Sequence, residues 1–235
     1  MTGPDPIAVL ADRYKLDAAA PDRLRALVAI VASDPLAPTT VRDPSRIIDD
    51  HLADSLVALE LPVVQAATRI ADLGAGAGFP GLPLAIARPD VQVFMIESSV
   101  RKCAFIDRAA AECGAANAEA VHTRAEEWRD GLESCDLVVA RALAAPEVIA
   151  EYAAPLLRIG GTAVLWRGRR DGDAEAAGAR AASELGLSLG PVIPVQPYPG
   201  ARHRHLHVIE KVAPTPQRFP RRAGIARKRP LGHGV

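Results

Sequence analysis

The chain has few aromatic residues, few cysteines and no long apolar run, and each shortage excludes a class of protein. Aromatic side chains make up 4% of the 235 residues, so Ala, Val, Leu and Ile must build the core. The three cysteines, Cys103, Cys113 and Cys135, lack C-x-x-C spacing, which argues against disulfides or zinc. No apolar stretch approaches the roughly 18 residues of a membrane helix, and no signal peptide is evident. We therefore expect a cytoplasmic protein without a metal site.

The net charge is zero, but the charges are distributed unevenly along the chain. The sequence contains 28 Lys and Arg and 28 Asp and Glu. Residues 201–235 hold nine of the basic residues against one acidic residue, Glu210, so this end carries +8 and the first 200 residues carry −8. Such an asymmetry predicts a polyanion or a membrane surface as partner of the basic end.

The pattern of apolar residues divides the chain into three parts. Residues 1–62 carry apolar side chains at helical spacing over 6–33, with a break at Pro21, and again over 47–59. Residues 63–212 alternate short β-rich runs with helical patterns, which is typical of a parallel sheet with crossover helices. Residues 213–235 are rich in Pro and Gly, and we expect this tail to be disordered or docked.

The predicted sheet has seven strands and ends in an antiparallel pair, because the short Pro-Tyr-Pro-Gly turn at 197–200 can join only antiparallel neighbours. The predicted strands are residues 69–73, 91–97, 119–122, 137–141, 162–168, 190–196 and 205–211. The helices predicted between them are residues 80–87, 101–113, 146–157 and 173–185.

A glycine-rich turn follows the first predicted strand and precedes a helix. Glycines let the backbone turn tightly and approach a ligand, and the helix offers free N–H groups. Gly76, Gly78 and Gly81 have the G-x-G-x-x-G spacing of dinucleotide-binding folds. Gly74, Gly76 and Gly78, with Asp72 before them, instead resemble the first motif of class I S-adenosylmethionine-dependent methyltransferases. The glycines alone leave both cofactors open.

The ends of the later strands favour S-adenosylmethionine. Glu97 ends the second predicted strand, where a carboxylate can accept hydrogen bonds from both ribose hydroxyls of either cofactor. Ala125 and Glu126 follow the third strand, where methyltransferases contact adenine, and Gly160-Gly161 resembles the L-x-P-G-G turn before their fifth strand. Taken singly, each feature could be a helix cap or a solvated strand end. In this order they predict an α/β class I methyltransferase with a Rossmann-like seven-stranded mostly parallel sheet, helical N-terminal additions and a basic C-terminal extension.

Three separated blocks are similar to one methyltransferase family. The glycine loop from Asp72, D-L-G-A-G-A-G-F-P-G-L-P-L-A-I-A, is preceded by H-L-A-D-S-L from His51 and followed by F-P-R-R-A-G-I-A-R-K-R-P-L from Phe219. In this order they resemble the RsmG family of 16S rRNA guanine-N7 methyltransferases, once called glucose-inhibited division protein B. The resemblance covers roughly residues 45–231; Phe219 stands for the usual Tyr and Ala226 for the usual Pro.

This resemblance implies methyl transfer from S-adenosylmethionine to N7 of a guanine in 16S rRNA near the decoding site. The partner would be 16S rRNA or the 30S subunit, with no membrane and no metal. The chemistry agrees, because N7 has a free lone pair and needs no prior deprotonation. Residues 136–141 also lack the N-P-P-F/Y motif of amine methyltransferases and the Pro-Cys motif for pyrimidine C5. From loop and resemblance together, the predicted cofactor-binding residues are Asp72, Gly74, Gly76, Gly78, Phe79, Glu97, Ala125, Glu126 and Arg141.

Arg141, at the end of the fourth predicted strand, is the single candidate catalytic residue. Its guanidinium could orient the cofactor carboxylate or the target base, since paired donors suit guanine O6 or a phosphate. The alternative is a surface arginine paired with Asp136 or Glu147.

The tail is predicted to bind RNA through its basic residues, with Phe219 stacked on a base; the alternative is a merely solvated tail. His203, His205 and His207 have spacing that can bind metal, but without a fourth ligand they predict a partly exposed edge strand. A nicotinamide-dependent oxidoreductase and a non-catalytic rRNA-binding protein remain alternative functions. The predicted RNA-binding residues are Arg218, Arg221, Arg222, Arg227, Lys228 and Arg229.

Overall fold

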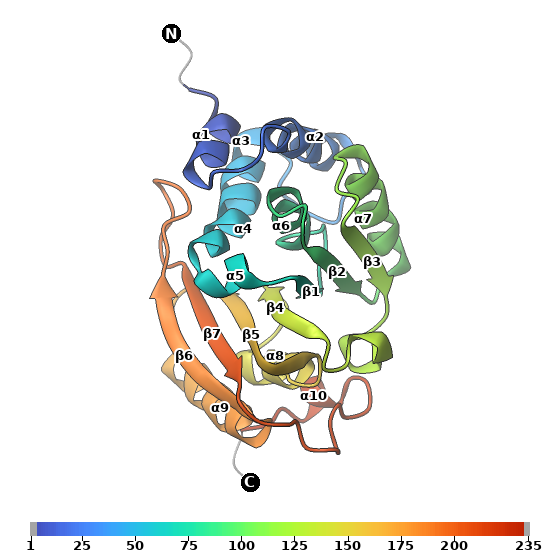
Figure 1. Ribbon diagram of the computed structural model, residues 1–235, viewed down its shortest axis with the longest axis vertical. Coiled ribbons are helices and arrows are strands. Elements are labelled where there is room, and N and C mark those ends of the chain that lie inside the picture. Colours follow the sequence, from blue (N-terminus) through green and yellow to red (C-terminus); the bar gives the residue numbers. More distant parts are fainter. Residues whose placement is uncertain (1–3, 233–235) are drawn as a thin grey trace.

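A seven-stranded sheet lies between two layers of helices in the computed structural model, which describes residues 4–232 (Figure 1). The strand order is β3-β2-β1-β4-β5-β7-β6. The first five strands are parallel, and β7 runs antiparallel to both β5 and β6. The strands are β1 Arg69–Leu73, β2 Gln92–Glu97, β3 Ala118–His122, β4 Cys135–Arg141, β5 Leu157–Arg167, β6 Leu187–Pro194 and β7 His205–Lys211.

The predicted fold class and the antiparallel pair at the end of the sheet are confirmed. Within the described chain, no helix is long and apolar enough to cross a membrane. The helices are α1 Pro6–Arg13, α2 Ala20–Ser33, α3 Pro44–Ile47, α4 Asp54–Leu56, α5 Pro62–Ala66, α6 Gly81–Ala87, α7 Val100–Glu112, α8 Pro146–Ala153, α9 Gly172–Glu184 and α10 Ile225–Lys228.

Alternating strand side chains divide the core into one cluster on each face of the sheet. Ile70 and Val139 pack with the N-terminal helices and with α6 and α7. Ala71 and Val138, their neighbours in the chain, pack with α8 and α9 on the other face. This follows from the two-residue period of a strand, which turns successive side chains to opposite faces. Both faces are covered, as a largely parallel sheet requires.

The segment before the sheet is helical but not one regular helix, contrary to the prediction for residues 47–59. The π-helix η1, Ile48–Ala53, joins α3 to α4, and the 3₁₀-helix η2, Val57–Glu60, ends the segment. This irregular segment contacts the sheet: the indole nitrogen of Trp166 in β5 donates to the carbonyl of Asp54 at 2.6 Å. Local periodicity could not reveal this contact with β5.

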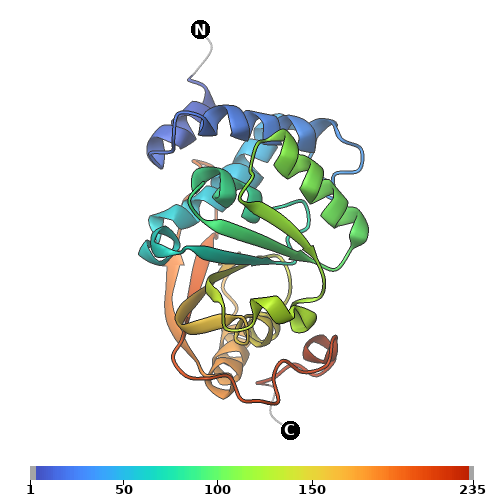
Figure 2. The ribbon, with the colours of Figure 1, turned by 45° about the vertical axis from the view of Figure 1, so that its right-hand side comes forward.

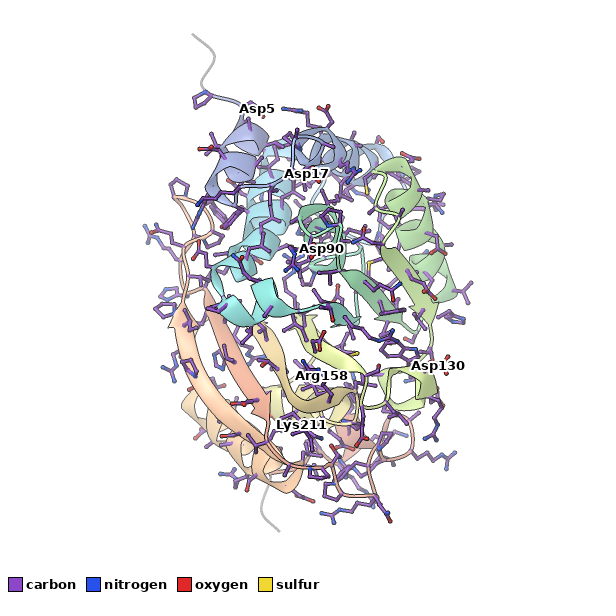
Figure 3. All side chains as sticks on the ribbon, in the orientation of Figure 1. Asp5, Asp17, Asp90, Asp130, Arg158 and Lys211 are labelled. Atoms are coloured by element: carbon purple, nitrogen blue, oxygen red, sulfur yellow. The ribbon has the colours of Figure 1, made fainter. Side chains whose placement is uncertain are left out.

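The C-terminal tail docks on the face covered by α8 (Figure 2). Phe219 is 7% exposed and packs in the core cluster with Ala226, so the prediction that Phe219 stacks on a base is wrong. Arg221 donates to both carboxylate oxygens of Glu151, a side chain that is 1% exposed. Just before the tail, Lys211 at the end of β7, labelled in Figure 3, donates from its buried ammonium to the carbonyl of Ala154 at 2.7 Å. The tail is therefore part of the folded structure.

Three predicted details of the β5–β7 region are wrong. Gly160 and Gly161 lie in an irregular stretch inside β5, where Gly160 has φ +81°, and not in a turn before the strand. β7 lies between β5 and β6, so His205 and His207 are not on an edge strand. β6 begins at Leu187, three residues before the predicted start.

Candidate active site

The loops after β1, β2, β3 and β4 enclose a cavity of about 420 Å³ at the carboxyl edge of the sheet, which we call the cofactor cavity. Its volume is in the range of small-molecule sites, and ligands of open α/β sheets bind at this edge. Residues lining it are Gly74, Ile96, Glu97, Ser98, Lys102, Thr123, Arg124, Ala125, Glu126, Ala142, Leu143, Tyr152 and Arg227.

The glycine loop forms one wall of this cavity. Gly74, Gly76 and Gly78 have φ values of +68°, +60° and +85°, a region that side chains other than glycine rarely adopt. A Cβ on Gly74 would lie 2.4 Å from Cδ1 of Leu143 on the facing loop. The course of the loop therefore strongly favours glycine at these positions.

Asp72 lies beneath the loop and does not line the cavity. Its carboxylate accepts a hydrogen bond from the Gly81 amide at 2.8 Å, which fixes the start of α6. Complete burial raises the pKa of Asp72 to about 7, against the opposing effect of the Gly81 hydrogen bond. The structure thus supports Asp72 as a residue that positions the glycine loop.

Glu97 presents a buried carboxylate to the cavity from the end of β2. Its Oε1 accepts from the Ser99 amide at 2.9 Å and its Oε2 from the Gly76 amide at 3.2 Å. The ammonium of Lys102 lies 3.6 Å from Oε2. These contacts fix the carboxylate where its remaining lone pairs can accept hydrogen bonds from two ribose hydroxyls.

The tail supplies another wall, which the sequence did not indicate. Glu126 accepts a hydrogen bond from the Gly224 amide at 2.8 Å, and Arg227 donates to the carbonyl of Leu143 at 3.1 Å while lining the cavity. Arg227 was predicted to bind RNA, but the structure places it beside Glu126 in the cofactor cavity. No short sequence motif indicates that Arg227 lines this cavity, because residues 126 and 227 come together only in the folded protein.

A second cavity of about 250 Å³ adjoins the first, and we call it the arginine cavity. Ala142 lines both cavities and has φ +54°, an unusual conformation at the end of β4. The arginine cavity is lined by Asp54, Arg141, Ala142, Trp166, Arg167, Gly168, Val195, Arg204 and His205.

Arg141 lies in the wall of the arginine cavity and is 15% exposed, so it is not the surface arginine of the alternative prediction. Its guanidinium donates to Asp54 at 3.0 Å and to the carbonyl of Asp50 at 3.0 Å. It also lies 5.6 Å from the ring centre of Phe79, on which His51 is stacked. Arg141 therefore connects the glycine loop to the N-terminal helical segment.

Asp136, a partner considered for Arg141, contacts other groups. It accepts from the backbone and hydroxyl of Thr68 and from Arg158. Burial and, to a lesser extent, the neighbouring Arg141 lower the pKa of His51 below its ordinary value.

The predicted cofactor residues thus fall into three groups. Gly74, Glu97, Ala125 and Glu126 line the cofactor cavity. Arg141 lines the arginine cavity, and the other predicted residues shape the loop between them: Asp72, Gly76, Gly78 and Phe79.

Apart from Arg227, the predicted RNA-binding residues divide into those paired with an acidic side chain of the protein and those with a free charge. Arg218 pairs with Glu184 and Arg221 with Glu151. Among the described residues, the exposed side chains of Arg222, Lys228 and Arg229 have neither an ion pair nor a hydrogen bond. These three cations are available to an external anion.

The sheet order, the glycine loop and the fixed Glu97 carboxylate define a class I S-adenosylmethionine-dependent methyltransferase. Solved structures agree on the fold. A SAM dependent methyltransferase from Aquifex aeolicus aligns with a TM-score of 0.55 at 17% identity, covering 72% of this chain and 94% of that one. Aeropyrum pernix fibrillarin, in complex with natively bound S-adenosyl-L-methionine, gives 0.53 at 19% identity, covering 67% and 72%.

Within this class, the family model of rRNA small subunit methyltransferase G, GidB, matches residues 34–189. The Ribosomal RNA small subunit methyltransferase G of Synechococcus sp. (strain JA-3-3Ab) is 42% identical over 205 residues, covering 83% of this chain and 78% of the relative. That of Gloeobacter violaceus is 40% identical over 217 residues, covering 90% and 85%. The chain belongs to this family, and the resemblance seen in the sequence is confirmed. Neither alternative function, the nicotinamide-dependent oxidoreductase or the non-catalytic rRNA-binding protein, is favoured.

Proposed function

We propose that this protein methylates N7 of a guanine in 16S rRNA, with S-adenosylmethionine as methyl donor. The observation that carries the proposal is the pair of adjoining cavities at Ala142, one suited to the cofactor and one lined by Arg141, Arg167 and Arg204. Family membership supports the same reaction. Ribosomal RNA as substrate makes the cytoplasm the expected location.

Glu97, Gly74 and the tail wall would hold the cofactor in its cavity. When bound, S-adenosylmethionine supplies a methyl group whose bond to sulfur breaks as its bond to N7 forms, so the positive charge passes to the purine. The guanine uses a lone pair that is already free, and no proton leaves N7. The chain therefore needs no general base, and its tasks are to align the base and to exclude water.

Arg222, Lys228 and Arg229 of the docked tail support RNA binding by charge. Phosphates attract exposed cations through counterion release, which makes the affinity fall with salt. The body of the protein is acidic overall, so these residues and the arginine cavity offer the positive surface that RNA requires. We infer that RNA lies across the tail and reaches the arginine cavity.

The proposal is tested by transfer of labelled methyl groups to two substrates prepared without this modification, intact 30S subunits and naked 16S rRNA. We expect label at one guanine, and reverse transcription after cleavage at N7-methylguanosine identifies it. Binding of rRNA without incorporation of label would instead support the non-catalytic alternative. Label on adenine or on an exocyclic amine would overturn the N7 assignment.

A further inference from the structure

Asp54 is a buried carboxylate with one oxygen left without a hydrogen bond. The residue is 6% exposed. Its Oδ2 accepts from Arg141 at 3.0 Å, and its backbone carbonyl accepts from the Trp166 indole. Its Oδ1 has no hydrogen-bond partner; the Nε of Arg204 lies 3.3 Å away as an ion pair. The carboxylate is thus charge-paired, but this oxygen keeps its lone pairs free for hydrogen bonds, and a ligand that donates to it would satisfy them.

Asp54 also lines the arginine cavity, and its buried Oδ1 becomes reachable for a ligand there once Arg204 moves aside. The cavity of about 250 Å³ is smaller than the roughly 300–1,000 Å³ of sites for drug-sized molecules, and it suits a single base. Trp166 and His205 contribute flat rings to its walls, and such rings can stack on an unpaired base. Arg204, which is 36% exposed, can move from Asp54 toward a phosphate.

We propose that Oδ1 of Asp54 accepts hydrogen bonds from N1–H and the N2 amine of the target guanine and so selects guanine for methylation. This inference rests on the proposed function, since it names the residue that recognises the base. One carboxylate oxygen has two lone pairs and can accept from both neighbouring donors. The two guanine donors would lie against Oδ1 of Asp54 in the place that the Nε of Arg204 now occupies.

Recognition is needed because N7 does not by itself identify guanine. Adenine carries the same nitrogen with a free lone pair, but its N1 is an acceptor and would face the carboxylate without a hydrogen. Guanine presents donors at N1 and N2, which a fixed carboxylate prefers. Asp54 is fixed, because Arg141 and Trp166 hold both its side chain and its backbone.

The same contact presents the reacting edge to the cofactor cavity. N7 lies on the five-membered ring, on the side of the purine away from N1 and N2. A base bound to Asp54 through N1 and N2 therefore directs N7 away from Asp54, and Ala142 is where the two cavities meet. Methylation makes the purine cationic and its N1–H more acidic, so the hydrogen bond to a carboxylate strengthens in the transition state.

The test replaces the target guanine in 16S rRNA by inosine, which lacks only the N2 amine. With wild-type protein we expect the single-turnover methylation rate to be about 10- to 100-fold higher on guanine than on inosine. The rRNA affinity, measured without cofactor, should be severalfold higher for guanine. In Asp54→Asn the amide still accepts but carries no charge, and the preference for guanine should fall to about threefold or less.

Asp49→Asn is the matched control, because Asp49 lies in the same helical segment and its exposed side chain does not line the arginine cavity. It should keep the wild-type preference. S-adenosylmethionine affinity reports whether each variant is folded, and Asp54→Ser replaces Asp54→Asn if the latter does not fold.

Equal wild-type rates on guanine and inosine, or an unchanged preference in the Asp54 variant, would overturn the role of Asp54 while leaving the proposed function intact. Failure of the wild type to methylate guanine-containing rRNA or 30S subunits would overturn the proposed function itself.

Discussion

The cofactor cavity and the arginine cavity lie side by side at the same edge of the sheet, but different parts of the chain build them. The cofactor cavity is shaped by backbone, with glycines at positive φ and a carboxylate fixed by two amides. The arginine cavity is shaped by side chains of Asp54, Arg141, Trp166 and Arg204, which come from four separate segments. The first suits a ligand common to many enzymes, and the second can be specific to one substrate.

This comparison predicts that changes in one cavity leave the ligand of the other nearly unaffected. The tail complicates the separation, because its Arg227 lines the cofactor cavity while the same tail carries the free cations Arg222, Lys228 and Arg229. Four variants, in order of decreasing expected effect, can test how far the two cavities are independent.

The largest effect is expected from Gly74→Val. Valine would have to adopt φ +68°, and its Cβ would lie within 2.4 Å of Leu143. We expect S-adenosylmethionine affinity, measured by calorimetry, to fall by about 1,000-fold, on the order of 4 kcal/mol, while rRNA affinity stays near the wild-type value. Gly172→Ala is the control, since a Cβ there meets nothing within 4 Å. Cofactor affinity of Gly74→Val within tenfold of wild type would contradict the role of the loop.

Arg221→Ala should weaken the cofactor cavity through the tail. It leaves the Glu151 carboxylate buried without its cation, and breaking a buried pair costs about 3 kcal/mol or more. We expect faster proteolysis after residue 213, a lower free energy of unfolding, and weaker cofactor binding because Arg227 leaves the cavity wall and Glu126 loses its hydrogen bond from Gly224.

The control is Arg218→Ala, whose partner Glu184 is exposed, so its cost should stay below about 1 kcal/mol. The preference for guanine over inosine should survive in Arg221→Ala, since no tail residue lines the arginine cavity among the described residues. Loss of that preference would show that the two cavities are not independent.

A moderate effect is expected from the double variant Arg222→Ala and Lys228→Ala. If each side chain contacts one phosphate, rRNA affinity should fall for all sequences, and the slope of log affinity against log salt should shrink by about 2. Cofactor affinity should not change. Arg25→Ala with Arg101→Ala removes equal charge from α2 and α7, and an identical salt slope in both double variants would argue against RNA binding by the tail.

The smallest effect on either cavity is expected at Asp136, at the opposite edge of the sheet. Burial there would raise its pKa, but hydrogen bonds from Thr68 and Arg158 outweigh this and lower the pKa to about 2 (Figure 3 labels Arg158). The pKa of Asp136 in the folded protein lies below the ordinary value of 3.8. The ionised carboxylate therefore contributes its full stabilisation of the fold above pH 3.8, and this stabilisation is lost as the pH falls toward 2.

Asp136→Asn should therefore be less stable than wild type at pH 7, and the difference in free energy of unfolding should shrink at pH 3. The exposed Asp130→Asn serves as control. Neither variant should alter the affinity for cofactor or rRNA at pH 7. A stability difference that is independent of pH would rule out the carboxylate as its source.

The cofactor side of the site could be predicted because its signals are local. Gly74, Gly76 and Gly78 are adjacent to the strand that places them, and Glu97 ends the next strand, so motif and position agree. The exception is Arg227, which joins this cavity only because the tail folds back over α8. Phe219 failed as a prediction for the same reason, since its surroundings come from residues far away in the chain.

The sequence by itself determined the seven strands, the antiparallel pair at the end of the sheet, the glycine loop, the cofactor class and the family, because each rests on short-range periodicity or on contiguous motifs; the place of β7 between β5 and β6 was not among them. Only the tertiary structure decided that Asp54 pairs with Arg141, that Arg204 faces them, and that the tail is docked. Those contacts join residues that are tens of positions apart, and their energies depend on burial, which no local pattern encodes. The base-recognition side of the site is therefore a product of the fold.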